Sequence, residues 1–419
     1  MFAELEELGQ RARRVSRQLR TLNTTIKNDA LAAIAEAILQ RQAEILTANS
    51  QDLEAGRAAG LDEPLLERLM LNEKRLEAIA ADVGSVAALV DPVGESFDAR
   101  TLPNGLQISK RRVPIGVIGT IYESRPNVTV DIAALCLKSG NAAILRGGKE
   151  ATHSNAALAE AVSAGCQKAG VSPDAVQLLR SQERAMVKAM LTANQYIDMI
   201  IPRGGPALQR FALENATIPV ITGGVGICHV YVDESADADK AVPIVFNAKV
   251  QRPTICNALD VLLIHSAVAA ELLPKIAGEL ARAGVELRCE PRAYELLTGH
   301  PQARAAGSQD FDTEFLSLVL AVRVVDSLEE AIEHIEQHST RHSDAIVTES
   351  YSNAMRFVDE VDSAAVYVNA STRFTDGAQF GLGAEVAIST QRLHARGPLA
   401  LRELTSYKWI VLGRGHVRP

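Results

Sequence analysis

From residue 115 to residue 203 the chain alternates between short apolar runs that are typical of strands and longer segments with the apolar spacing of helices. The strand-like runs are residues 115–121, 142–146, 176–179 and 197–201, and the helical segments include 128–138 and 156–169. Such alternation favours a parallel sheet covered by helices, because each helical crossover returns the chain to the same end of the sheet. The pattern predicts an α/β fold.

A second alternating series begins near Gly223. It contains apolar runs at residues 230–232, 261–264, 318–322, 345–347 and 365–368, and helical patterns at residues 267–283 and 328–337. Ser327 and Glu330 form a capping-box pattern before the last of these helices. Earlier in the chain, residues 27–48 and 65–89 also have helical spacing. We therefore expect a chain that opens all-helical and continues into two α/β domains.

Residues 98–113 interrupt the helical pattern of the first part of the chain. Asn104-Gly105 lies between short alternating segments there, an arrangement typical of a β-hairpin. Residues 407–412 form a strand-like tail with no sequential partner. This tail can pair with the hairpin, either within one chain or across two subunits.

The charge balance argues against a nucleic-acid-binding protein. The chain has 419 residues, of which 47% are hydrophobic and 22% charged, with a net charge of −8. Binding to nucleic acid needs a concentrated basic face, and Lys110-Arg111-Arg112 is the strongest basic run. We interpret that triplet as the edge of a solvated strand.

The cysteines and the N-terminus indicate the compartment. Five cysteines, an odd number without a C-x-x-C pair, suit a reducing environment. Residues 1–8 are acidic where a signal peptide is basic, and runs such as residues 316–322 are much shorter than the roughly 20 residues that span a bilayer. We expect a soluble cytoplasmic protein that binds no membrane and no nucleic acid.

Cys256 is the cysteine whose surroundings favour chemistry. It follows a polar stretch, residues 247–257, in which Lys249 and Arg252 can stabilise a thiolate, the nucleophilic form of the side chain. The other four cysteines lie in apolar segments and are interpreted as small core residues: Cys136, Cys166, Cys228 and Cys289.

Two glycine pairs follow strand-like runs. Residues 146–149 (Arg-Gly-Gly-Lys) end one strand, and ligands in open α/β sheets bind outside the carboxyl ends of strands. Residues 203–205 (Arg-Gly-Gly) lead into a helical segment whose N–H groups can hold a phosphate. The chain has no G-x-G-x-x-G, so the usual dinucleotide fingerprint is absent and ordinary solvated turns remain the alternative.

Three histidines spaced by four residues, His334, His338 and His342, suggest a metal site at first sight. The apolar stripe of this helix lies at other positions, and no further ligand cluster accompanies the histidines. We interpret them as a solvated helix face and expect no metal.

Four long motifs occur in order along the chain. They are residues 113–130 (VPIGVIGTIYESRPNVTV), 145–151 (LRGGKEA), 251–257 (QRPTICN), and 394–398 with 404–409 (HARGP and LTSYKW). In these motifs, and over essentially its whole length, the chain resembles the γ-glutamyl phosphate reductases, a family of proline-synthesis enzymes in the aldehyde dehydrogenase superfamily.

The resemblance implies an aldehyde dehydrogenase-like fold of two parallel-sheet α/β domains and a small β oligomerisation flap. Residues 1–97 and 113–222 would form the NADPH-binding domain, and residues 223–392 the catalytic domain with its nucleophilic cysteine. The hairpin, residues 98–112, and the tail, residues 393–419, would form the flap of a homo-oligomer.

The resemblance also implies an activity: Cys256 attacks L-glutamyl 5-phosphate, phosphate departs, and NADPH reduces the resulting thioester to L-glutamate 5-semialdehyde. In the superfamily a lysine and a glutamate hold the adenosine ribose, and the matching positions here are Arg146 and Lys149. A cation in place of the acid favours the 2′-phosphate of NADPH over the hydroxyl of NADH. The residues expected at the cofactor are Arg146, Gly147, Gly148, Lys149, Gly204, Gly205 and Glu314, the last at the nicotinamide ribose.

Other site residues follow from the same resemblance. The backbone N–H of Cys256 and the side chain of Asn127 are candidate donors to the oxyanion. Arg125 and Arg373 are candidates for the substrate carboxylate or the departing phosphate. Hydrolytic relatives carry a glutamate before a glycine pair, whereas residues 220–224 (Val-Ile-Thr-Gly-Gly) have no acid, which fits a reductive reaction.

Three alternatives stay open at this point. One is another aldehyde dehydrogenase, CoA-acylating or hydrolytic, with the same cysteine. A second is a cysteine hydrolase that would use His229 or His265 as its base. The third is a non-catalytic nucleotide-binding assembly protein.

Overall fold

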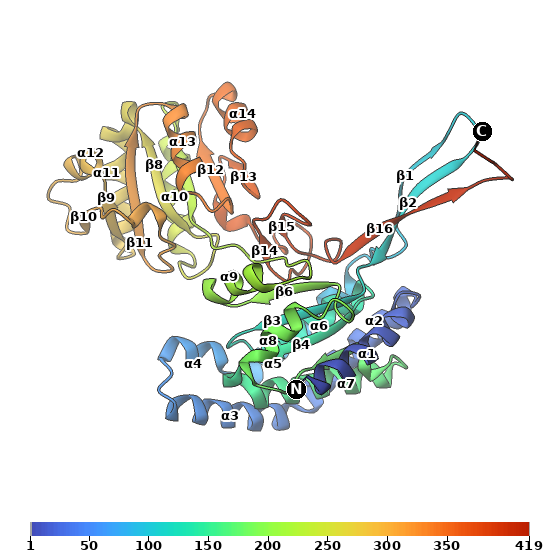
Figure 1. Cartoon of the computed structure of the whole chain (residues 1–419). Helices are drawn as coiled ribbons and strands as arrows, with labels where there is room; N and C mark the ends of the chain where they lie inside the picture. The colour runs from blue at the N-terminus through green and yellow to red at the C-terminus, as the bar shows by residue number, and fades with distance from the viewer. Residues whose placement is uncertain (1, 419) are drawn as a thin grey trace. The chain divides into compact units, whose positions relative to one another are not determined.

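The computed structural model describes residues 2–418, which form two compact units (Figure 1). The first unit comprises Met1–Gly223, Gly381–Ala387 and Leu399–Pro419, and the second comprises Gly224–Phe380 and Ile388–Pro398. Each unit contains its own parallel sheet covered by helices.

The sheet of the first unit has the strand order β5-β4-β3-β6, and every pairing in it is parallel. Its strands are β3 (Val117–Tyr122), β4 (Ala142–Gly147), β5 (Val176–Leu178) and β6 (Met199–Arg203). All residues of β3 and β4 are buried, as expected for central strands with helices on both faces. The parallel sheet predicted from the alternating pattern is thereby confirmed.

Nine α-helices belong to the described part of the first unit. They are α1 (Ala3–Leu19), α2 (Thr24–Gln40), α3 (Gln42–Ala58), α4 (Glu63–Leu69), α5 (Glu73–Ala88), α6 (Asn127–Lys138), α7 (Thr152–Lys168), α8 (Arg184–Leu191) and α9 (Pro206–Asn215), with short 3₁₀ turns at Lys149–Ala151 and Pro173–Ala175.

Each of the two long helices expected near the N-terminus is in fact a pair of helices. Residue 41 separates α2 from α3, and both helices pack against α7, so packing rather than a Gly or Pro residue sets the break. The segment 65–89 is interrupted before α5, where the side chain of Asn72 accepts a hydrogen bond from Arg75 N at 2.8 Å. A cap of this kind starts a new helix.

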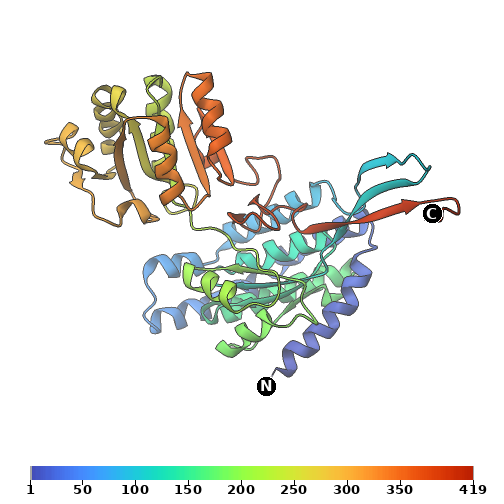
Figure 2. The ribbon, with the colours of Figure 1, turned by 45° about the horizontal axis from the view of Figure 1, so that its top comes forward.

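A three-stranded antiparallel sheet contains β1 (Ser96–Thr101), β2 (Gln107–Pro114) and β16 (Thr405–Leu412) in the order β1-β2-β16. The tail strand β16 pairs with the hairpin along its whole length and within the same chain (Figure 2), which confirms the first of the two expected pairings. Lys110 of β2 is not a simple solvated residue, because its Nζ lies 4.7 Å from the ring centroid of Tyr407 and 5.2 Å from that of Trp409.

The second unit contains a seven-stranded parallel sheet in the order β10-β9-β11-β8-β7-β12-β13. Its strands are β7 (Cys228–Val232), β8 (Leu259–His265), β9 (Glu286–Cys289), β10 (Ala303–Ala305), β11 (Val319–Val325), β12 (Ser343–Val347) and β13 (Ala365–Val368). Its helices are α10 (Ala238–Val250), α11 (Ser266–Arg282), α12 (Pro291–Leu296), α13 (Leu328–His338) and α14 (Tyr351–Glu360), with 3₁₀ turns at Asp310–Asp312 and Thr372–Phe374. A short pair, β14 (Ile388–Ser389) and β15 (Gly397–Pro398), completes the unit.

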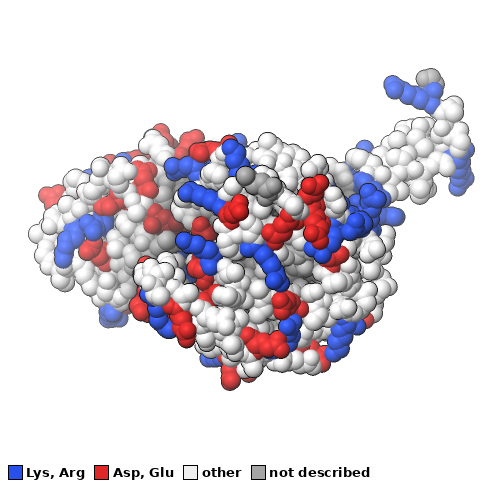
Figure 3. All heavy atoms as spheres, turned by 60° about the horizontal axis from the view of Figure 1, so that its bottom comes forward, with Lys and Arg blue, Asp and Glu red and all other residues white. Residues whose placement is uncertain are grey.

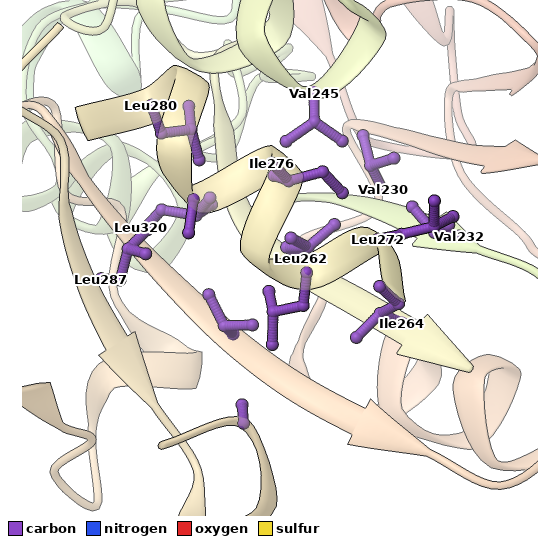
Figure 4. Packing of buried hydrophobic residues seen from close by; sticks show 14 of the residues in the cluster. Val230, Val232, Val245, Leu262, Ile264, Leu272, Ile276, Leu280, Leu287 and Leu320 are labelled. Carbon is purple, nitrogen blue, oxygen red and sulfur yellow. The ribbon is translucent and has the colours of Figure 1, made fainter. Parts of the chain in front are cut away.

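One of the apolar core clusters of the second unit lies between its sheet and helices α10 and α11 (Figure 4). Burial of these aliphatic side chains stabilises the unit by roughly 1.5–3 kcal/mol for each fully buried large side chain. The labelled members of the cluster are Val230, Val232, Val245, Leu262, Ile264, Leu272, Ile276, Leu280, Leu287 and Leu320. The core fixes the ends of α10 and β8, and therefore both ends of the loop that carries Cys256.

Basic and acidic side chains are interspersed over the face of the described residues that Figure 3 shows, without a continuous basic surface. This distribution agrees with the net charge of −8. Among residues 2–418, no helix is both long enough and apolar enough to cross a bilayer.

Candidate active site

Cys256 lies in the loop between α10 and β8 and is half-buried, whereas the other four cysteines are buried. The prediction that those four pack as core residues is confirmed. The polar stretch before Cys256 is not all loop, because residues 247–250 form the last turn of α10. The reactive-cysteine candidate thus sits just after a helix whose position the core holds.

Gly226 approaches the Cys256 loop so closely that no side chain fits between them. A Cβ atom at position 226 would lie 1.5 Å from the carbonyl oxygen of Cys256. The backbone N–H of Gly226 also donates to Glu314 Oε1 at 2.9 Å. Gly226 therefore joins the Cys256 loop and Glu314.

Glu314 is half-buried in the segment that precedes β11. Burial raises the pKa of its carboxyl group, and the hydrogen bond from Gly226 partly opposes this shift. The family resemblance implied that Glu314 and Cys256 belong to one site, and within the second unit Gly226 contacts both residues.

A buried polar network lies under the Cys256 loop. The thiol of Cys228 donates to the carbonyl oxygen of Cys256 at 3.2 Å, and burial raises the pKa of that thiol well above its usual range, so it stays protonated as a donor. His342 Nδ1 lies 3.9 Å from Cys228 Sγ and 2.8 Å from Ser343 Oγ. No local sequence pattern indicates this network, since Cys228 lies 28 residues before Cys256 and 114 residues before His342.

The residue after Cys256 is anchored to a second loop. Asn257 Nδ2 donates to the carbonyl oxygen of Thr375 at 2.9 Å, and the carbonyl oxygen of Asn257 accepts from Thr372 Oγ1 at 2.8 Å. Arg373 belongs to the same turn and donates from Nε to Gln251 Oε1 at 3.1 Å. Burial lowers the pKa of its half-buried guanidinium. The structure thus brings Arg373 beside the segment that carries Cys256.

Lys249 lies in the last turn of α10 and not in a loop. It is fully buried on α10, and its Nζ contacts the carbonyl oxygen of Leu259 at 2.8 Å and Asp260 Oδ1 at 3.3 Å. Burial lowers the pKa of Lys249 and raises that of Asp260, while the ion pair opposes both shifts. The interpretation of Lys249 as a loop cation was wrong because the helix extends through residue 250. Arg252 lies beyond the helix and is exposed.

Asn127 and Arg125 belong to the first unit. Asn127 is the first residue of α6, and its Nδ2 donates to Asp131 Oδ2 at 2.8 Å. Burial raises the pKa of Asp131 to about 7, and the hydrogen bond from Asn127 opposes this shift. Arg125 is exposed in the turn before α6.

The first glycine pair lies at the carboxyl end of β4. Arg146 is 8% exposed, and its Nη2 contacts the carbonyl oxygens of Gln182 and Glu183, both at 3.4 Å, while its Nε is buried without a hydrogen-bond partner. A Cβ atom on Gly147 would lie 2.0 Å from Asn155 Nδ2. Gly148 precedes a 3₁₀ turn that begins with the exposed Lys149.

The second glycine pair lies between β6 and α9. Gly205 is the N-cap residue of α9, and its N–H donates to Glu123 Oε2 at 2.9 Å. A Cβ atom on Gly204 would lie 2.3 Å from the same carboxylate oxygen. A carboxylate therefore occupies the helix N-terminus at which we expected a phosphate.

The interpretation of the three spaced histidines as a solvated face was wrong. His334 and His342 are 3% and 0% exposed, and α13 ends at His338, so His342 lies beyond the helix. His334 packs edge-on against Phe311, with ring centroids 5.3 Å apart. Within residues 2–418, no group of three or more histidine, cysteine or acidic side chains is arranged to hold a metal ion.

Comparison with known proteins gives one consistent result. A family model described as the aldehyde dehydrogenase family matches residues 3–292 and 306–410. A gamma-glutamyl phosphate reductase of Roseiflexus castenholzii is 58% identical over 423 residues, with 100% of both chains covered. One of Tolumonas auensis is 55% identical over 405 residues, covering 96% of this chain and 97% of that relative. The crystal structure of gamma-glutamyl phosphate reductase from Thermotoga maritima matches with a TM-score of 0.97 and 49% identity, covering 99% of this chain and 100% of that chain.

Proposed function

The chain belongs to the aldehyde dehydrogenase family, and from this premise we propose that it reduces L-glutamyl 5-phosphate to L-glutamate 5-semialdehyde and phosphate, with NADPH as the reductant. The observation that carries the proposal is the half-buried Cys256, held by Gly226 and Asn257 in a chain that matches gamma-glutamyl phosphate reductases over its full length. This reaction is the second step from glutamate to proline.

Cys256 performs the covalent step. Its thiolate attacks the C5 carbonyl, a C–S bond forms, and the C–O bond to phosphate breaks as phosphate departs with the electron pair. Phosphate is a stabilised anion, so no strong general acid is needed. A bound nicotinamide supplies the hydride that converts the thioester to the oxidation level of the aldehyde. When the C–S bond then breaks, the thiolate is regenerated and the aldehyde leaves.

The C5 carbonyl oxygen of the substrate becomes negatively charged during these steps, and this oxyanion needs hydrogen-bond donors. We assign this role to the backbone N–H of Cys256 and to the amide of Asn127. The amide carries two hydrogens, of which Asp131 accepts one. Arg125 and Arg373 are the proposed partners of the substrate carboxylate or the departing phosphate.

Members of this family use nicotinamide cofactors, and the first unit fits such a group. Beside Gly147 lies a cavity of about 170 Å³, and the buried Nε of Arg146 lacks a partner. Arg146, Gly147, Gly148 and Lys149 would hold the adenosine end, and Glu314 the nicotinamide ribose. Glu123 already accepts the N–H of Gly205, so the pair Gly204 and Gly205 does not offer that N–H to the pyrophosphate. Cations near the first glycine pair favour the 2′-phosphate of NADPH over the hydroxyl of NADH.

The cysteine-hydrolase alternative loses support. His229 is fully buried, and His265 Nδ1 already accepts from Ala267 N at 3.1 Å, so neither histidine is placed as a general base. A CoA-acylating activity remains the second candidate within the same family, and the full-length match to gamma-glutamyl phosphate reductases favours the acyl phosphate.

We also propose that the protein is a cytoplasmic homo-oligomer that assembles through the sheet β1-β2-β16. The side chains of Trp409, Val411 and Leu412 on β16 are 50–58% exposed, which is unusual for a row of large apolar residues. Light scattering of the purified protein measures the oligomer mass.

The decisive experiment runs the reaction backwards. Purified protein should reduce NADP⁺ when given L-glutamate 5-semialdehyde and inorganic phosphate, and should not do so when phosphate is omitted or replaced by CoA. Cys256→Ala should abolish the reaction, whereas Cys166→Ala, at a buried position in α7, should keep it. Full turnover without phosphate would refute the assignment of an acyl phosphate.

A further inference from the structure

A cavity of about 170 Å³ lies at the carboxyl ends of the neighbouring parallel strands β4 and β5. Gly147 at the end of β4, Thr152, His153 and Ala156 in the first turns of α7, and Leu179 and Arg180 after β5 line it. This volume is below the 300–1,000 Å³ typical of pockets that hold a whole drug-sized ligand. The cavity therefore suits one end of a dinucleotide.

The N-terminus of α7 cannot supply the anion-binding groups of this cavity. Asp52 Oδ1 accepts from His153 N at 3.1 Å, and Asp52 Oδ2 accepts from Ser154 N at 2.7 Å and from Ser154 Oγ at 2.6 Å. The first amides of the helix are thus already paired with a buried carboxylate. The amides of His153 and Ser154 are therefore not free to bind a phosphate, which makes the side chains that line the cavity the stronger candidates.

The backbone of Arg180 is held in place by hydrogen bonds, whereas its guanidinium is exposed and can change its position. The backbone N–H groups of Arg180 and Ser181 donate to the two carboxylate oxygens of Glu4, at 2.7 and 3.2 Å. Its guanidinium makes only a long contact, 3.4 Å, to Glu160, and both side chains are more than half exposed. An exposed pair of this kind is worth about 0–1 kcal/mol, so a phosphate dianion can replace Glu160 as the partner.

The other cations near the first glycine pair are less suitable. The guanidinium of Arg146 is buried against the carbonyl oxygens of Gln182 and Glu183, so it supports the loop that carries Arg180. Lys149 is exposed and does not line the cavity. His153 also lines the cavity and offers a second donor.

We infer that Arg180, assisted by His153, binds the 2′-phosphate of NADPH in this cavity and makes the enzyme selective for NADPH over NADH. The inference rests on the proposed function and deepens it, since it names the residue that sets cofactor preference. A guanidinium can donate two parallel hydrogen bonds to one phosphate, which a single lysine ammonium matches less well.

The test uses the full-length protein and two matched probes, 2′-AMP and 5′-AMP, whose dissociation constants are measured by calorimetry. Arg180→Gln should weaken 2′-AMP by about 10- to 100-fold, the range expected for a lost hydrogen bond between charged groups, and should leave 5′-AMP within about twofold. The kcat/KM for NADPH should fall in parallel while that for NADH is unchanged. Arg180→Lys should retain part of the selectivity, and Lys188→Gln, at an exposed cation of α8 outside the cavity lining, should change nothing.

Two outcomes would overturn the inference. If Arg180→Gln binds 2′-AMP with wild-type affinity while Lys149→Gln no longer binds it, Lys149 is the residue that binds the 2′-phosphate. If Arg180→Gln weakens both nucleotides equally, the residue supports the cavity without selecting the cofactor. A different result would contradict the proposed function. In that case the wild-type protein would bind 2′-AMP selectively but would show no phosphate-dependent reduction of NADP⁺.

Discussion

Gly226 lies against the carbonyl oxygen of Cys256, and a Cβ atom at position 226 would come within 1.5 Å of that oxygen. The same glycine donates its N–H to Glu314. Because the contact is with backbone, it cannot be relieved by turning a side chain. The position of Cys256, the proposed nucleophile, therefore requires a glycine at position 226.

We predict that Gly226→Ala displaces the Cys256 loop and lowers kcat by about 100-fold, the loss that follows when a reacting group is misplaced by roughly 1 Å. Phosphate-dependent NADP⁺ reduction measures the loss. Gly278→Ala on α11 is the matched control, because a Cβ atom there meets nothing within 4 Å and alanine is the better helix former. Wild-type kcat in Gly226→Ala would show that the loop tolerates the displacement.

The buried pair of Lys249 and Asp260 predicts a stability effect. Asp260→Asn leaves the ammonium of Lys249 buried without its counter-charge, which should cost about 3–5 kcal/mol of the free energy of unfolding. The double variant Lys249→Met with Asp260→Asn should recover most of this loss, because no buried charge remains. Urea unfolding of the two variants measures the difference.

Activity provides a second readout of the same pair. Asp260 Oδ1 also accepts from Phe315 N at 3.3 Å, next to Glu314. Asp260→Ala, which removes this acceptor, should therefore raise the KM for the cofactor. Equal stability of the single and the double variant would contradict the proposed cost of the unpaired ammonium.

The local patterns in the sequence were enough to predict most of the secondary structure. The apolar runs that became β3, β4 and β8, and the Asn104-Gly105 turn, report local preferences that packing did not overrule. The same reasoning failed where the outcome depends on tertiary contacts. Residue 41 divides a helical pattern because α2 and α3 each pack on α7.

In the candidate site, too, local features could be predicted from the sequence and tertiary contacts could not. Cys256 stands out because its own neighbours are polar. The contact of Gly226 with Cys256, the network through Cys228 and His342, and the pairing of Lys249 with Asp260 join residues that no local pattern relates. His334 looked solvated from its helical position, yet it is buried because Phe311, from a distant turn, covers it.

The half-buried carboxyl group of Asp131 should make stability depend on pH. Burial raises its pKa to about 7 in the folded protein, above the value of about 3.9 of an unfolded chain. The folded state then binds the proton more tightly, so the contribution of Asp131 is complete below about pH 4 and is lost as the pH rises through 7. Allowing for its partial exposure, we expect this loss to be about 2 kcal/mol.

Asp131→Asn should remove this dependence, because an amide keeps an acceptor for Asn127 Nδ2 and does not ionise. The variant should unfold in urea with nearly the same free energy as the wild type at about pH 4 and should be more stable than the wild type at about pH 8. Asp359→Asn, at an exposed position of α14, controls for the loss of one negative charge. Parallel pH profiles for the wild type and Asp131→Asn would mean that the carboxyl group is solvated, and Asp131 would then serve only to orient the Asn127 amide.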